Sequence, residues 1–518
     1  MSDKIINTFQ QRRQLTQAIE AMGDTRTEAE LTAAARRIAH TYPADLVLST
    51  VLKYLDTPKS QLRGGLGHLA ALLPGDDATA ALRSAVANRQ NDPQIRITAA
   101  LILERFLGQT LPGALISDLE DSNEVAFQSL REAVEEGRTN RHILLEYVTQ
   151  MRETEAGVAL MVMDMLARLE PHDRVELLRL IAQDDRDAVA RDALQRLAAL
   201  GTTEAGEAAA RALHILRFSL PPSLAEIATR EGRKLQFGGV HYRPPAPDGW
   251  RALLAPADTG GNQVMWVVRN PASSGSPGTI LGFMLSARAG ILQMFASETI
   301  AAAHVPSPHA LGRIVPVNDG GGGEPVAMLE IPFDVGRQLV VRAQAAHWDG
   351  TAVTSFPGEL KLYGDLLWQF DAPEVEPTLT PYLAPLTPDA SLPDLEELAD
   401  MTGDLLAHGA MQGWLTRNPL LLKMVELPKS VVRTLPLDLL VHQVLQAIAG
   451  WEGRDQLLAA FAEALHAQAL WFTLAGDDID AARAEVLAAA MTQIPIERNP
   501  LLAAILTNGL AAASDRAG

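Results

Sequence analysis

The sequence predicts a mainly α-helical chain with an α+β insert. Three observations lead to this fold class: an apolar pattern that repeats about every 32 residues over the first two-fifths of the chain, a change to short β-branched runs near residue 234, and a return to helical periodicity after residue 393. They divide the 518 residues into an α-solenoid over 1–230, a small α+β domain over 231–380 and a helical bundle over 381–518. The last two are expected to form either two domains or one packed unit.

An apolar stripe occurs six times between residues 31 and 201. Four of the six copies keep +4, +7 and +11 spacing, which places their residues on one face of a helix. Successive copies start 31, 33, 31, 32 and 32 residues apart, a period typical of stacked helical hairpins that cover one another's apolar sides. We expect the stripe residues to form the solenoid core; they are Leu31-Ala35-Ile38-Tyr42, Leu62-Leu66-Leu69-Leu73, Ile95-Ala99-Ile102-Phe106, Ala126-Leu130-Ala133, Val158-Val162-Met165-Leu169 and Ala190-Leu194-Leu197.

Proline and glycine separate the stripes and leave room for a second helix in each repeat, for example between Pro43 and Pro58. The segment Asp92-Pro-Gln-Ile-Arg96-Ile-Thr-Ala-Ala-Leu101 resembles the second helix of a HEAT repeat, and residues 187–194 resemble a weaker copy. The aspartate at the start can cap the helix, and the arginine four residues on can reach that aspartate or its copy in the next repeat. The resemblance covers about residues 25–230 and implies a curved scaffold with a concave binding face. It identifies the HEAT/armadillo-like superfamily without choosing a member, because Thr32, Phe127 and Ala159 replace the arginine in other repeats.

Composition restricts the class of protein. The chain is 47% hydrophobic and 21% charged, as in folded globular proteins, and its net charge of −19 is spread so that each of the three segments is acidic. Nucleic-acid binding is therefore disfavoured. The absence of cysteine excludes disulfides, thiolate nucleophiles and Cys-ligated metals, and fits a cytoplasmic protein. The N-terminus lacks the apolar region of a secretory signal, and the uncharged run 499–514 is too short to span a membrane, so we expect a soluble chain.

The middle segment is expected to hold a mixed or antiparallel sheet with covering helices. Turn-rich stretches separate the candidate strands, which are 235–237, 250–254, 264–268, 279–283, 326–331 and 339–344. Candidate covering helices are 297–303 and 358–370.

Several residues of this segment resemble fragments of functional sites. Gly320–Gly323 lacks the Lys-Ser/Thr and helix of a phosphate loop, and we expect a hairpin connection there. His304 and His309 are separated by prolines and have no third ligand nearby, so two loop histidines are favoured over a metal pair. His347-Trp348-Asp349 is expected to be a turn at a strand end with an aromatic plug. The sequence contains no nucleophile elbow, zinc-binding helix or dinucleotide fingerprint. It therefore predicts no catalytic, cofactor or metal site.

The C-terminal segment begins with a connector, residues 371–393, that holds six prolines and is expected to be extended. Helices are then predicted over 395–410, 420–425, 435–449, 454–474, 479–491 and 501–513. They show no constant period, so we expect a helical bundle. Trp414, Trp451 and Trp471 are expected in its core or between domains.

These patterns favour a non-catalytic cytoplasmic scaffold or adaptor that binds a protein partner through the solenoid surface. The alternative is an enzyme with its site in the central domain or at its contact with the solenoid, using residues such as Asp258, His304 or Asp349. A nucleic-acid-binding solenoid would need a cationic stripe, to which Arg63, Arg96 and Arg191 contribute because they occupy one repeated position.

Overall fold

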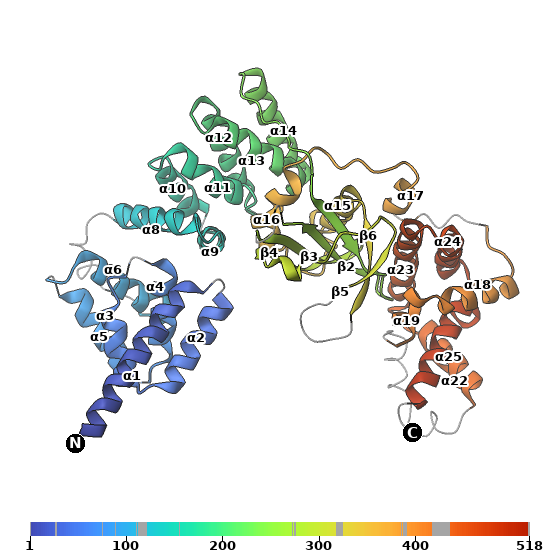
Figure 1. The fold of residues 1–518 in the computed structure, drawn as a ribbon, viewed down its shortest axis with the longest axis horizontal. Coiled ribbons are helices and arrows are strands. Elements are labelled where there is room, and N and C mark those ends of the chain that lie inside the picture. The colour runs from blue at the N-terminus through green and yellow to red at the C-terminus, as the bar shows by residue number, and fades with distance from the viewer. Residues whose placement is uncertain are drawn as a thin grey trace. The chain divides into compact units, whose positions relative to one another are not determined.

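The computed structural model describes residues 2–25, 28–57, 59–74, 76–88, 90–109, 111, 122–154, 156–271, 273, 276–317, 325–384, 386, 391–416 and 436–515. The chain forms two compact units, Met1–Tyr242 (unit 1) and Arg243–Gly518 (unit 2). It is mainly helical with a six-stranded antiparallel sheet in the middle of the sequence, as the fold class predicts (Figure 1). Unit 2 takes in both the predicted α+β domain and the predicted helical domain.

The regular elements of unit 1 in its described residues are all helices, and each predicted apolar stripe lies on a helix except for the last residues Tyr42, Leu73 and Leu169, which follow the helix ends. Pro171 and Pro222 occupy the first turns of their helices, where the missing N–H costs no hydrogen bond. The helices are α1 (Ser2–Glu20), η1 (Ala21–Asp24), α2 (Glu28–Thr41), α3 (Ala44–Lys53), α4 (Ser60–Leu72), α5 (Asp77–Ala87), α6 (Pro93–Leu101), η2 (Ile102–Phe106), α8 (Ser122–Gly137), α9 (His142–Arg152), α10 (Ala156–Leu166), α11 (Pro171–Ile181), α12 (Asp187–Ala199), η3 (Leu200–Thr202), α13 (Gly206–Ser219) and α14 (Pro222–Phe237).

The helices that carry the stripes pack against one another and bury most of the stripe residues whose side chains are described. Helix α2 contacts α4, and α8, α10, α12 and α14 contact in succession, while α9, α11 and α13 form a second succession. Leu66, Leu130 and Leu194, which occupy one position of the stripe, are fully buried. Helix α14 also extends the pattern, because Leu224, Ala228 and Glu231 keep the +4 and +7 spacing and are buried. The predicted strand 235–237 is wrong, since these residues end α14.

Unit 2 contains the antiparallel sheet, whose strand order is β4-β3-β2-β1-β6-β5. Strands β1, β2, β3 and β6 were predicted, whereas β4 and β5 were not. Two predictions are wrong: 339–344 lies within helix α15, and most of 297–303 belongs to β4 and to the 3-10 turn η4. The elements are β1 (Trp250–Leu254), β2 (Asn262–Arg269), β3 (Gly278–Ser286), β4 (Gly290–Ile300), η4 (Ala302–His304), β5 (Ile314–Val317), β6 (Val326–Ile331) and α15 (Phe333–Trp348).

Helix α15 covers one face of the sheet and contacts β1 to β4 (Figure 1). The approach is close at Gly336, where a Cβ atom would lie 2.8 Å from Cβ of Ala252. On the opposite face, Leu253, Val268 and Met328 form a core with Val305 of the loop that follows β4. The central part of the sheet is therefore covered on both faces, which explains why a strand such as β3 is apolar almost throughout.

A buried ion pair crosses the sheet between β1 and β6. Arg251 Nη1 lies 3.0 Å from Glu330 Oε2, and the same guanidinium donates to the carbonyl of Pro306 and to Asn270. Burial lowers the pKa of Arg251 and raises that of Glu330, and in each case the partner's charge opposes the shift. The pair thus joins two strands and a loop at a site from which water is excluded.

The C-terminal helices dock on the end of β1 through three buried polar side chains. Trp414 Nε1 donates to the carbonyl of Ala257 at 2.8 Å, and Trp471 Nε1 donates to that of Leu254 at 3.0 Å. Gln468 accepts the N–H of Ala257 at 2.9 Å. The expected packing role of Trp414 and Trp471 is confirmed, whereas Trp451 is 39% exposed. The helices are α16 (Gly358–Trp368), α17 (Thr380–Leu383), α18 (Leu395–Ala407), η5 (Gly409–Met411), α19 (Gln412–Thr416), α22 (Leu437–Ala449), α23 (Arg454–Ala475), α24 (Asp478–Gln493), η6 (Ile496–Arg498) and α25 (Pro500–Asp515).

The predicted helices of this region match α16, α18 and α22 to α25 within a few residues, and the prediction over 420–425 lies outside the described residues. One described helix, α23, is long and apolar enough to cross a membrane by length and composition, but 61% of its most apolar window is buried inside the protein. Its length and apolar composition equally fit a buried core helix, and α23 packs on α24.

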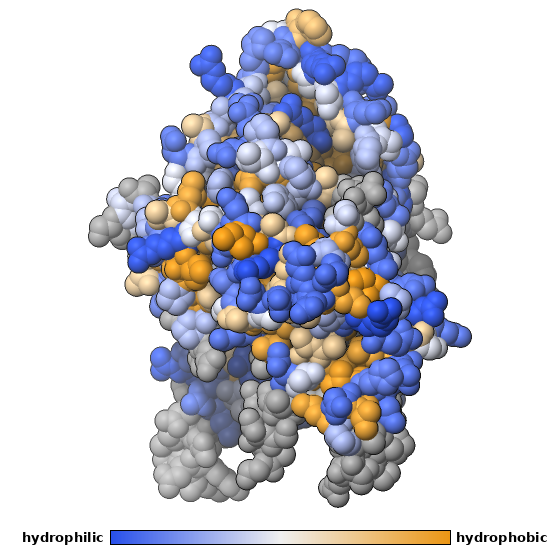
Figure 2. Space-filling model, turned by 90° about the vertical axis from the view of Figure 1, so that its right-hand side faces the viewer, coloured by the Kyte–Doolittle hydropathy of each residue, from blue (hydrophilic) through white to orange (hydrophobic). Residues whose placement is uncertain are grey.

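On the face drawn in Figure 2, hydrophobic residues lie in patches interrupted by hydrophilic ones.

Candidate functional site

Polar contacts between neighbouring helices of unit 1 recur at the period of the sequence repeat. Each of four ion pairs joins an arginine to an acid 32 to 35 residues away. These pairs are Arg138–Asp173 at 3.0 Å, Arg141–Glu176 at 3.2 Å, Arg196–Asp164 at 2.6 Å and Arg152–Asp185. These separations are close to the spacing of the apolar stripes, so the period appears in the side-chain contacts as well as in the sequence.

Two arginines also donate to carbonyl groups at or just beyond the ends of helices that lie about 32 to 35 residues earlier in the chain. Arg186 donates to the carbonyls of Thr154 at 2.6 Å and Met151 at 3.3 Å, where α9 ends, and Arg196 donates to that of Met163 in the last turn of α10 at 2.9 Å. The last four carbonyls of a helix have no partner within the helix, and Met163 is among those of α10, so Arg196 supplies a donor for one of them. Asp184 holds Arg186 in place through two bonds of 2.8 Å.

The same separation occurs near the N-terminus of unit 1. The Tyr54 hydroxyl lies 2.6 Å from Glu20, and Lys59 lies 3.1 Å from Asp24, at separations of 34 and 35 residues. Burial and the Glu20 carboxylate raise the pKa of Tyr54 to about 12.

The Glu176 carboxylate contacts two arginines, which change its pKa. Burial alone would raise its pKa, but Arg179 and Arg141 outweigh that effect and lower the pKa to about 2. Glu176 accepts from Arg179 at 2.6 Å within α11 and from Arg141 of α9 at 3.2 Å. It is therefore a charged link between two neighbouring helices.

The arginines considered for a cationic stripe have three different environments. Arg63 pairs with Glu132 at 2.6 Å, Arg96 is buried and donates to the carbonyl of Val86, and Arg191 pairs with Asp187 within α12 at 2.5 Å. The predicted contact between the aspartate and the arginine of a repeat is thus confirmed in the 187–194 copy. Because Arg96 is buried, the three do not line one exposed surface.

The central candidates lie apart in different loops. Asp258 accepts the N–H groups of Gly260 and Asn262 at 2.8 and 2.9 Å, which closes the turn between β1 and β2. His304 ends η4 and is exposed, and the backbone N–H of His309 bonds to the Glu330 carboxylate. Gly320–Gly323 lies outside the described residues.

The His347-Trp348-Asp349 segment ends helix α15, so its expected place at a strand end is wrong. His347 Nε2 accepts the N–H of Ile291 at 3.0 Å, and burial lowers the pKa of His347. The Trp348 ring stacks on Phe356 with centroids 4.8 Å apart. The ring of His347 thus holds the start of β4, and Trp348 closes the helix end with an aromatic contact.

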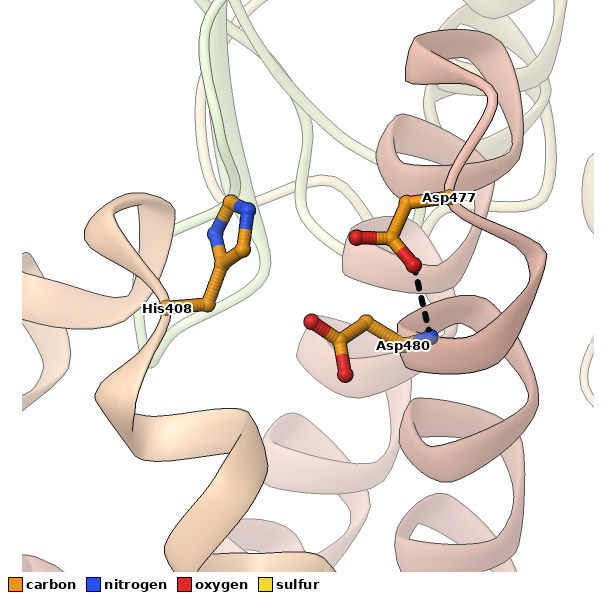
Figure 3. A group of neighbouring side chains, drawn as sticks. All are labelled: His408, Asp477 and Asp480. Atoms are coloured by element: carbon orange, nitrogen blue, oxygen red, sulfur yellow. Dashed lines mark hydrogen bonds between the residues drawn. The ribbon is translucent and has the colours of Figure 1, made fainter.

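One group of metal-capable side chains comes together in the part of the chain that is described: His408, Asp477 and Asp480 (Figure 3). One ligand atom from each lies within 4.8 Å of the others. His408 precedes η5, and the two aspartates begin α24. No sequence motif pointed to this group, because His408 is remote from the aspartates in the chain.

The bonds of this group fit a helix cap better than a metal centre. His408 Nδ1 accepts the N–H of Ala410 at 3.1 Å, which places the proton of the neutral ring on Nε2 and leaves that nitrogen no lone pair for a metal. Asp477 accepts the N–H of Asp480 at 3.1 Å, and Asp480 pairs with Arg483 at 2.7 Å. Each side chain therefore has a structural partner, and the positive end of α24 favours the carboxylates without a cation.

Comparison of the chain with protein-family models, curated proteins and solved structures gave no match.

Proposed function

We propose that this chain is a non-catalytic cytoplasmic scaffold or adaptor, in which unit 1 is a HEAT-like α-solenoid that binds a protein partner. The observation that carries the proposal is the common period of the apolar stripes and of the polar contacts between helices, 32 to 35 residues in α8 to α12. Stacked repeats of this kind present an extended surface made of equivalent positions, which suits a partner of matching length.

The exposed residues of the stripe helices are the proposed contact surface. Arg131 on α8 and Gln195 on α12 are exposed, and each directly follows the central residue of its stripe. In the ion pairs described above, each arginine of unit 1 is matched by an acid, which supports a protein partner over a nucleic acid, whose binding needs a continuous cationic surface. The lack of cysteine supports the cytoplasmic location.

Site-specific photocrosslinking in the full chain tests this proposal. A photoreactive amino acid is placed at Arg131 or Gln195 in unit 1, and at Thr299 or Thr378, which are exposed in unit 2, as matched controls. After irradiation in lysate of the native host, we expect one protein to crosslink from both unit 1 positions and from neither control. Crosslinks from the unit 2 positions alone, or none from any position, would contradict binding through the helical repeats.

A further inference from the structure

Within unit 2, the connector that follows α16 contacts helices α15 and α23. We call residues 371–384 the strap. At its start, Arg337 donates to the carbonyl of Asp371 at 2.7 Å, and Asp334 accepts the N–H of Glu374 at 3.2 Å. Both side chains belong to the first turns of α15. The proline-rich sequence is thus fixed by side chains of a neighbouring helix.

The far end of the strap is held by α15 and α23. Arg342 of α15 donates to the carbonyl of Tyr382 at 3.0 Å, and His466 of α23 lies 3.3 Å from the carbonyl of Ala384. Leu379 is buried, whereas most other residues of the strap are exposed. A few side-chain bonds and one apolar contact therefore hold an otherwise exposed segment.

His466 differs from the other side chains that hold the strap, because it can change charge near neutral pH. The ring is buried, and both of its nitrogens face oxygen atoms: Nδ1 lies 2.6 Å from Glu485 Oε1 and Nε2 lies 3.3 Å from the Ala384 carbonyl. A carboxylate and a carbonyl oxygen only accept. A neutral imidazole has one N–H, so only the doubly protonated ring donates to both.

The charged groups at this junction come from three helices. Helix α24 contributes Glu485, α23 contributes Glu463, and α15 contributes Arg342, whose Nη2 lies 3.0 Å from Glu463. The ring of Tyr382 in the strap lies 6.1 Å from that of His466. Arg342 is already paired with Glu463, and the carboxylate that contacts the imidazole is that of Glu485.

We propose that His466 is a proton-operated latch for the C-terminal end of the strap. The doubly protonated ring binds Glu485 and Ala384 together. When the ring loses one proton, the remaining N–H stays on the shorter, charge-assisted bond to Glu485, and the lone pair of Nε2 then faces the Ala384 carbonyl. The strap end at residues 383–384 is released, while the arginine bonds, which do not titrate in this range, keep the rest in place.

Hydrogen exchange of the full chain, measured by mass spectrometry between pH of about 5.5 and 8.5 and corrected for intrinsic rates, tests the latch. The amides of Leu383 and Ala384 bond to the carbonyls of Leu379 and Thr380 and report the strap end. We expect their protection to fall roughly tenfold as the pH rises, the effect of losing one hydrogen bond to a charged group. Peptides from the first turns of α15 should keep their protection.

Two variants and a control separate the latch from a merely structural role. Glu485→Gln should move the midpoint of release to lower pH, because the anion that favours the charged ring is gone. His466→Gln should make the protection of the strap end independent of pH. His442→Gln, at an exposed histidine of α22, should leave the midpoint of the wild type unchanged.

Nitrogen-15 shifts of the His466 ring give a second measurement, made on the wild type; the signal is assigned by its absence in His466→Gln. The latch requires both ring nitrogens to be protonated at the low end of the pH range. A singly protonated ring there, a strap whose protection ignores pH, or an unchanged midpoint in Glu485→Gln would each overturn the proposal.

Discussion

Each of the two units is stabilised by its own side-chain contacts, and these contacts differ in how far apart along the chain the two partners lie. In unit 1, the side-chain bonds between α8 and α12 join residues about one repeat apart, such as Arg141 and Glu176. In unit 2, the bonds that dock the C-terminal helices on the sheet join residues far apart in the chain, such as Trp471 and Leu254, at a separation of 217. Unit 1 is thus stabilised by several similar contacts between residues about 32 to 35 positions apart, whereas the docking in unit 2 depends on a few contacts between residues far apart in the chain.

This difference predicts where substitutions act and how they are detected. All seven tryptophans lie in unit 2, so tryptophan fluorescence follows the unfolding of that unit, and far-UV circular dichroism follows the helices of both. Changes in unit 1 are expected to shift the circular dichroism transition alone.

The largest effect is expected at the buried ion pair of the sheet. Arg251→Met leaves the Glu330 carboxylate buried without its cation and should lower the free energy of unfolding of unit 2 by about 3–5 kcal/mol. Urea unfolding followed by tryptophan fluorescence measures this loss. The double variant Arg251→Met/Glu330→Leu removes both charges and should regain most of it; equal losses in the single and double variants would show that the pair itself is not the cause.

A smaller effect is expected at Arg186, which joins the start of α12 to the end of α9. Arg186→Met removes the bonds to the α9 carbonyls and leaves Asp184, whose side chain is 1% exposed, without its partner, at a cost of about 2 kcal/mol. Arg191→Met is the matched control, because Arg191 pairs only within α12 at an exposed site and should cost less than about 0.5 kcal/mol. Both are measured by far-UV circular dichroism during urea unfolding. Equal losses of unfolding free energy in the two variants would show that bonds between helices stabilise unit 1 no more than a bond within one helix.

The acid stability of unit 1 should depend on Glu176. Its pKa is about 2 in the folded chain against an ordinary value of 4.5, so its contribution is complete above pH 4.5 and is lost as the pH falls toward 2. We expect a loss of about 1–2 kcal/mol over this range, discounted because the side chain is 31% exposed. Glu176→Gln should flatten this part of the pH profile of urea unfolding, and Glu135→Gln, at an exposed pair with Arg138, should leave it unchanged.

The sequence predicted much of unit 1, because an apolar residue at +4 and +7 is visible without any knowledge of the fold. The prediction was wrong in part of unit 2, where a short apolar run fits the periodicity of a helix as well as that of a strand. Residues 339–344 are rich in valine and were interpreted as a strand, but Val340 and Ala343 are buried in a helix that packs on the sheet. Tertiary packing, which the run does not encode locally, decided the outcome.

The polar groups that matter most in unit 2 were beyond sequence reasoning for a related reason. His466 meets Ala384 and Glu485 at separations of 82 and 19 residues, which correspond to no motif. In unit 1, by contrast, the separation of polar partners equals the repeat, so the stripes alone would have located pairs such as Arg138 and Asp173. A period makes distant contacts predictable, and its absence hides them.

The smallest predicted effect concerns His347, which joins the end of α15 to the start of β4. Burial lowers its pKa in the folded chain, so the unfolded chain binds a proton more readily; stability is complete above the ordinary pKa of 6.5 and falls as the pH drops below it. A protonated ring also loses the lone pair that accepts the Ile291 N–H. Because the ring is only half-buried, we expect a loss below about 1 kcal/mol. His347→Gln keeps an acceptor without a titrating ring, so the fluorescence-detected Tm of unit 2 should fall less on acidification than in the wild type. An equal fall would assign the acid sensitivity of unit 2 to other groups.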